Sequence, residues 1–194
     1  MNIRLNILLA CLLLTSPFTS IWADKNDDAK YKETMDIFQQ SDTSGRHFND
    51  SYGYALFPTI GKGGVGVGAA YGEGRVYTNG NHIGDTSMTQ LSIGLQLGGQ
   101  AYSQIIFFED KRALEEFTSG NFEFGVGVSA VAITAGASAS TSTAGGASAS
   151  ASGNEDSAAT TGGYHKGMVV FTIAQGGLMY EASVSGQKFK YTSK

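Results

Sequence analysis

Alternation between side chains and glycine is the clearest pattern in this chain. Between residues 64 and 71 one set of positions carries side chains and the other is almost bare: Val65, Val67, Ala69 and Tyr71 against Gly64, Gly66, Gly68 and Ala70. A period of two predicts a β-strand. A strand face without side chains allows another part of the molecule, or a ligand, to come close. We favour close packing of this face, against an N-terminal helix.

The same alternation continues further along the chain. A turn signal at residues 72–74 precedes a short strand over 75–78, and Asn79 with Gly80 forms the next turn. In residues 90–98 every second position from Leu91 onward is Leu or Ile, which predicts a half-buried strand with glycine and amide groups on its outer face. Further strands are predicted over residues 103–108, 122–128, 167–174 and 178–184, with a last one ending near residue 191.

Helical periodicity appears in two places. In residues 29–40, Tyr31, Met35 and Phe38 fall at spacings of four and three and form one apolar stripe. We favour packing of this stripe on a sheet, although membrane contact would need the same stripe. Residues 24–28 before it are charged, and we expect them to be mobile. A short helix is predicted after the acidic residues 109 and 110, since acidic side chains suit a helix start.

These elements predict an α+β fold. We expect a mainly antiparallel, strongly twisted β-sheet or barrel-like domain, with an amphipathic N-terminal helix and one short helix between strands. Residues 134–163 differ from the rest because they are almost entirely Ala, Ser, Thr and Gly. Such a segment can bury little apolar area, so we interpret it as either a hairpin with small side chains or a flexible loop.

The first 23 residues predict a secretory signal. Arg4 gives a positive start, an apolar stretch follows, and Ala23 is a plausible cleavage point. We therefore expect an exported protein, periplasmic or secreted, with residues 24–194 as one domain. The single cysteine, Cys11, lies inside this segment. Its surroundings only faintly resemble a lipoprotein processing site, because the apolar stretch continues beyond it.

Composition and spacing argue against several kinds of chemistry. Cleavage after Ala23 removes Arg4, so Lys plus Arg falls from 13 to 12 against 17 Asp plus Glu, and the net charge goes from −4 to −5. A mildly acidic domain is a poor candidate for nucleic-acid binding. The glycine run lacks a hydroxyl residue after Lys62 and a helix after its glycines, which argues against a nucleotide site. Three isolated histidines predict neither a metal site nor a cofactor. We expect no catalysis.

Four cations lie within the predicted domain beside turns or a helix start: Lys62, Arg75, Lys111 and Arg112. Taken singly, each is a solvated surface charge. If the fold brings two or three of them together beside the glycine-rich face, they would form a phosphate-binding patch, the polar half of a site for a lipid headgroup.

Two ordered blocks of motifs resemble the SYLF lipid-binding family. The first comprises Phe57, Pro58, Lys62, Gly63, Gly64, Gly66, Gly68 and the run from Tyr71 to Gly74; the second comprises Gly94, Gln96, Gly98, Gly99 and Gln100. The resemblance covers residues 52–129 strongly and the final strands more loosely. It implies non-enzymatic binding of membrane phospholipid, with anionic phospholipids or phosphoinositides as ligands.

The resemblance and the residues together define the expected site. We expect headgroup contact from the four cations, and apolar contact from Tyr71 and the stripe formed by Tyr31, Met35 and Phe38. Some family members act on actin, but an exported, acidic chain without a partner domain is not expected to bind it. Two alternatives remain open: a small outer-membrane β-barrel, whose strands would need about 9–11 residues each, and a surface protein that assembles through residues 134–163.

Overall fold

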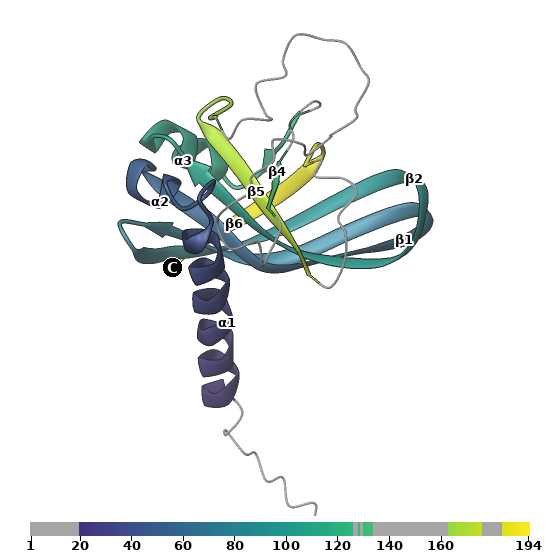
Figure 1. Cartoon of the computed structure of the whole chain (residues 1–194), viewed down its shortest axis with the longest axis horizontal. Coiled ribbons are helices and arrows are strands. Elements are labelled where there is room, and N and C mark those ends of the chain that lie inside the picture. Colours follow the sequence, from purple (N-terminus) through teal and green to yellow (C-terminus); the bar gives the residue numbers. More distant parts are fainter. Residues whose placement is uncertain (1–19, 126–127, 129, 134–162, 176–183) are drawn as a thin grey trace, which may run out of the picture.

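The structure is a computed structural model that describes residues 20–125, 128, 130–133, 163–175 and 184–194 (Figure 1). Most of the predicted signal segment, nearly all of residues 134–163 and most of the predicted strand 178–184 lie outside these residues.

The described chain forms one curled β-sheet with three helices at one end (Figure 1). The elements are α1 (Ser20–Gln40), α2 (His47–Asp50), β1 (Gly53–Thr78), β2 (Asn81–Phe108), α3 (Lys111–Phe117), β3 (Phe122–Glu123), β4 (Val131–Ile133), β5 (Met168–Gln175) and β6 (Gln187–Ser193). The strand order is β3-β6-β2-β5-β4, and β1 pairs with β2. Every pairing is antiparallel except that of β4 with β5. The predicted α+β fold is therefore confirmed.

The sheet is built around two strands that are much longer than predicted. β1 has 26 residues and β2 has 28, and they pair along their whole length around the turn at Asn79 and Gly80. The turn predicted at residues 72–74 is wrong, because these residues continue β1. A register shift between Val65 and Val67 interrupts the pairing near the middle of the ribbon.

The glycines of β1 allow this long ribbon to fold back onto itself. A Cβ atom added to Gly72 would lie 2.5 Å from Ile60 Cγ1, and one added to Gly74 would lie 2.6 Å from Phe57 Cδ1. Real Cβ atoms do not come so close to other atoms, so the first half of β1 packs directly against Gly72 and Gly74. At these two glycines the close partner is the same strand, not the N-terminal helix.

Two apolar clusters pack on opposite faces of the central strands. Neighbouring residues of β2 divide between them: Ile106 and Phe108 join the cluster that includes α3, and Ile105 and Phe107 join the cluster that includes α1. Because a strand points successive side chains to opposite faces, these clusters cover both sides of β2. One cluster thus holds α3 against the sheet, and the other holds α1 against its opposite face.

Both predicted helices are present, but α1 begins earlier in the chain than predicted. α3 begins as predicted, with the Asp110 side chain accepting a hydrogen bond from Ala113 N at 2.8 Å. α1, however, begins at Ser20 rather than residue 29, so residues 24–28, which we expected to be mobile, are part of this helix. Among the described helices, none is both long and apolar enough to cross a lipid bilayer.

Candidate functional site

The middle part of the β1–β2 ribbon, where the ribbon folds back, extends away from the three helices, toward the right of Figure 1. We call residues 61–73 of β1 with residues 87–100 of β2 the limb. Among the described strands, β6 pairs with β2 only at residues 84–90 and β5 only at residues 101–108. The intervening part of β2 pairs with β1 alone. The limb is therefore a two-stranded ribbon over much of its length.

The outer side of the limb presents an apolar face to solvent. Val67 is 62% exposed, Tyr71 is 53% exposed and Leu91 is 78% exposed. Ala69 is exposed between Val67 and Tyr71, and Leu91 is its partner in the register, so these residues share one side of the ribbon. We call Val67, Ala69, Tyr71 and Leu91 the apolar face. The prediction that Leu91 points toward the core is wrong.

Burial on the inner side of the limb explains this orientation. Ala70 is buried against the core, Gly72 lies against Ile60, and the side chain of Gln90 is buried with its Nε2 donating to Ser185 O at 3.0 Å. The small residues of β1 and the paired amide of β2 thus face inward, which leaves the larger apolar side chains outside. Large apolar groups held in water have no packing role, so this face is a candidate contact surface.

Two polar side chains accompany the apolar face. The Tyr71 hydroxyl donates a hydrogen bond to Glu73 Oε1 at 2.8 Å, and this bond, with the carboxylate charge, raises the pKa of Tyr71. Lys62 is half-buried on the limb, opposite Gln100 in the register. Within the described part of the chain it has no ion-pair partner. Of the predicted cations, Lys62 is therefore the one without an ion-pair partner among the described residues.

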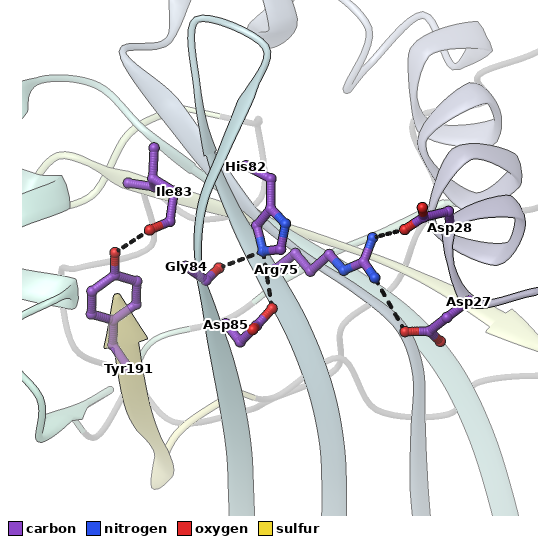
Figure 2. Close-up of polar contacts among 8 residues, drawn as sticks. All are labelled: Asp27, Asp28, Arg75, His82, Ile83, Gly84, Asp85 and Tyr191. Atoms are coloured by element: carbon purple, nitrogen blue, oxygen red, sulfur yellow. Dashed lines mark hydrogen bonds and ion pairs between the residues drawn. The ribbon is translucent and has the colours of Figure 1, made fainter. Parts of the chain in front are cut away.

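Arg75, by contrast, binds two carboxylates of α1 (Figure 2). Its Nη1 donates to Asp28 Oδ1 and its Nη2 lies 3.3 Å from Asp27 Oδ2. The guanidinium carbon sits 4.2 Å from the centre of the Tyr31 ring, a cation–π contact. We call these four residues the Arg75 clamp. The hydrogen bond and charge of Arg75 lower the pKa of Asp28, and His82 and Lys194 lower it further.

Next to the clamp, a second group of polar contacts orders the beginning of β2 (Figure 2). His82 Nε2 lies 2.9 Å from Asp85 Oδ1 and 3.1 Å from Gly84 O. On the other side of this strand, the Tyr191 hydroxyl donates to Ile83 O at 3.0 Å. These contacts hold the beginning of β2, where His82 is the register partner of Tyr77 of β1.

The predicted apolar stripe of α1 packs against the sheet in this conformation. Phe38 is fully buried and Tyr31 is nearly so. Met35 is half-buried, and its Sδ accepts a hydrogen bond from the Tyr54 hydroxyl at 3.4 Å. The favoured packing role of this stripe is what the structure shows. Contact of these side chains with lipid remains a prediction, and it requires α1 to move.

The last two predicted cations lie on α3 and pair with its own acidic side chains. Lys111 lies 2.7 Å from Glu115, and Arg112 lies 3.4 Å from Glu116. α3 packs with one apolar cluster, whereas Tyr31 of the Arg75 clamp packs with the other. The fold therefore does not gather the four cations into the single phosphate-binding patch that we considered.

Sequence reasoning missed the clamp and the orientation of the limb. Asp27 and Tyr31 are four residues apart on α1, so they share a helix face, and this spacing is the signal that could have suggested a common partner. Among the described residues, no group of three or more His, Cys, Asp or Glu side chains could hold a metal ion.

Comparison with known proteins gives two findings. The Ysc84 family model, described as Las17-binding protein actin regulator, matches residues 89–193. The second motif block lies in this range and the first lies before it. The chain is also similar to "Beta cell expansion factor A" of Aeromonas veronii, with 28% identity over 155 residues. That alignment covers 79% of this chain and 51% of the relative, so the chain spans about half the length of that relative.

Proposed function

Because this chain belongs to the Ysc84 family, the SYLF domain family, we propose that it binds the surface of phospholipid membranes without catalysing a reaction. The observation that carries the proposal is the apolar face of the limb. Val67, Tyr71 and Leu91 remain in water although the rest of the protein provides a large buried core. Contact with the apolar part of a bilayer would remove this surface from water, which is favourable in proportion to the area buried.

The shape of the surface favours a bilayer over a small ligand. Val67, Ala69 and Leu91 stand on the outer side of the part of the ribbon that pairs with no third described strand, and small-molecule sites are usually concave. A bilayer is a fluid partner that can surround a projecting ribbon. Tyr71 supports this choice, because a ring with a polar hydroxyl suits the boundary between headgroups and acyl chains.

Lys62 supports a preference for anionic lipid. It lies on the limb, five residues before Val67, and no acidic side chain of the described chain pairs with it. A single lysine near a membrane surface contributes about 1 kcal/mol of attraction to anionic lipid. Since the chain as a whole is acidic, we expect apolar contact to supply most of the affinity and Lys62 to add a modest preference for charge.

The name of the family model refers to a Las17-binding actin regulator, and we do not extend that role to this chain. The predicted secretory signal would place the protein outside the cytoplasm, periplasmic or secreted, where a membrane surface is the available partner. An anionic phospholipid of such a membrane is the proposed ligand class.

Vesicle flotation tests this proposal. Purified protein is mixed with vesicles of neutral phosphatidylcholine alone, or of phosphatidylcholine with phosphatidylglycerol, and the fraction that floats is measured. We expect flotation with both compositions and more with the anionic one. Absence of flotation with every composition would overturn the proposed function.

A further inference from the structure

Arg75 is the charged contact between α1 and the sheet. Each terminal nitrogen of its guanidinium pairs with one carboxylate (Figure 2). The face of the guanidinium contacts the Tyr31 ring. All three partners come from α1, whereas Arg75 comes from β1. The clamp therefore joins two elements separated by more than forty positions in the sequence.

Exposure differs sharply between the two sides of the clamp. The Arg75 side chain is only 14% exposed, whereas those of Asp27 and Asp28 are 56% and 64% exposed. Water therefore reaches both carboxylates, while α1 covers the arginine. An exposed ion pair contributes little to stability, because water and salt compete with it. An anion that binds the Arg75 guanidinium more strongly can therefore displace the two aspartates.

Lys194 and His82 lie near these aspartates, and so does Asp85, which pairs with His82. Besides Arg75, His82 and Lys194 act on Asp28 closely enough to lower its pKa. His82 belongs to β2, and Tyr77, two residues after Arg75, is its partner in the register. A guanidinium fork matches two oxygens of a phosphate as well as it matches two carboxylates. The Arg75 guanidinium therefore has the chemistry of a phosphate-binding group.

We propose that Arg75 is the centre of a phosphate-binding site that Asp27 and Asp28 of the same chain occupy in this closed form. The phosphate group of an anionic phospholipid competes with the two aspartates for the guanidinium and loosens α1 from the sheet. This inference rests on the proposed function for the source of the phosphate. It adds to that function a second contact, away from the limb, which is covered until lipid is present.

Loosening α1 would uncover apolar surface that suits the same membrane. Tyr31 lies directly under the guanidinium, and Met35 lies one turn further along the same side of α1. The end of the helix is more firmly held, because Phe38 is fully buried and its carbonyl accepts a hydrogen bond from Ser44 Oγ at 2.6 Å. We therefore expect α1 to tilt about its C-terminal end and to remain attached there.

Paired charge variants on α1 separate this site from a general effect of charge. Asp27→Asn with Asp28→Asn removes both occupants. Its matched control is Glu33→Gln with Asp36→Asn, which removes two charges of the same helix that do not contact Arg75: Glu33 is exposed, and Asp36 is half-buried and pairs with Lys32. We expect the first pair to tighten binding to phosphatidylglycerol vesicles about three- to tenfold more than the control. Adding Arg75→Gln should abolish that difference.

Equal tightening by the two pairs would overturn the proposal, because it would show only reduced repulsion from the membrane. An unchanged affinity in the Asp27/Asp28 variant would overturn it as well. Circular dichroism of each variant checks that it is folded.

A second measurement leaves the clamp intact. Spin labels at Lys30 of α1 and Lys190 of β6, both exposed, are placed in a Cys11→Ser background, and the distance between them is measured by pulsed electron resonance. We expect this distance to lengthen with anionic vesicles and not with neutral ones.

Inorganic phosphate, compared with chloride at equal ionic strength, shows whether the free anion also lengthens the distance. Lengthening with free phosphate would support the site but not its restriction to lipid. No lengthening with either would overturn the proposal. Because the phosphate arm needs no vesicle, it still tests the site if the proposed function fails.

Discussion

Replacing Val67 and Leu91 by threonine tests whether the apolar face drives membrane binding. Threonine keeps a strong preference for β-strands, so the ribbon should be retained. Val67→Thr exchanges one methyl for a hydroxyl, and Leu91→Thr removes the equivalent of about two carbon groups, each worth about 0.8 kcal/mol on burial. The exposed fractions of 62% and 78% scale these losses to about 0.5 and 1.2 kcal/mol.

The sum, about 1.7 kcal/mol, corresponds to about twentyfold weaker binding if the bilayer covers both side chains completely. Half coverage would give about fourfold. Vesicle flotation at increasing lipid concentration measures this ratio directly. Stability should change little, within about 1 kcal/mol, because neither side chain is buried in the core. Urea unfolding of the same samples checks this expectation.

A matched control is available in the other large exposed apolar side chains. Ile37 and Tyr52 are 42% and 39% exposed and lie outside the limb. Ile37→Thr with Tyr52→Thr removes exposed apolar surface elsewhere and should leave vesicle binding unchanged. The reasoning is refuted if both double variants lose affinity equally, or if wild type binds vesicles and the Val67/Leu91 variant binds them just as well.

Three further predictions concern the parts of the fold that position the site. Phe38→Ala should lower the free energy of unfolding by about 3–5 kcal/mol, measured with urea, because it leaves a cavity where α1 meets the sheet. Gly74→Ala should cost about 1–3 kcal/mol in the same assay, since the new methyl would meet Phe57, whereas Gly61→Ala, which has open space, should cost much less; equal losses would contradict the folded-back ribbon. Asp28 has a pKa lowered from 3.8 in the folded chain, so its stabilising effect is present above that value and is lost as the pH falls through the folded-state pKa. The difference in unfolding midpoint between wild type and Asp28→Asn should therefore be constant near neutral pH and disappear in acid.

Period-two patterns predicted the two long strands of this protein, whereas the strand predicted over residues 122–128 is present, among the described residues, only at Phe122–Glu123. The alternation at residues 64–71 lies in β1, and that at residues 90–98 lies in β2. The α3 start was also predictable, because an acidic residue before a helix is a local signal that the Asp110 cap realises. Such features depend only on residues that are close together in the chain, so the sequence alone is enough to predict them.

The sequence could not show which face of each strand is buried. Alternation shows which side chains share a face, but the partner of the sheet decides which face is buried. Here Ile60 and Phe57 fill the glycine side of β1, so the small residues are inside and Leu91 is outside. The same distant contact explains why Gly72 and Gly74 continue a strand although their local preference is for a turn.

The clamp could not be predicted for a related reason. Arg75 and Asp28 meet only because α1 lies across the end of the folded ribbon. Taken separately, the first is a surface cation and the second is one of several acidic residues in a charged segment. Their contact is a consequence of tertiary structure, and it changes the interpretation of Arg75 from a free headgroup contact to an occupied one.

The most direct test of the central claim asks whether the apolar face enters the bilayer. A bimane label at Thr89, an exposed residue on the outer side of the limb paired with Tyr71, leaves the apolar face intact in a Cys11→Ser background. Vesicles containing lipids with a spin-label quencher on the acyl chain are then added. We predict strong quenching at Thr89 and little for the same label at Glu115 of α3, which is exposed and lies away from the limb. Vesicle binding without quenching at Thr89, or with equal quenching at both positions, would contradict the account.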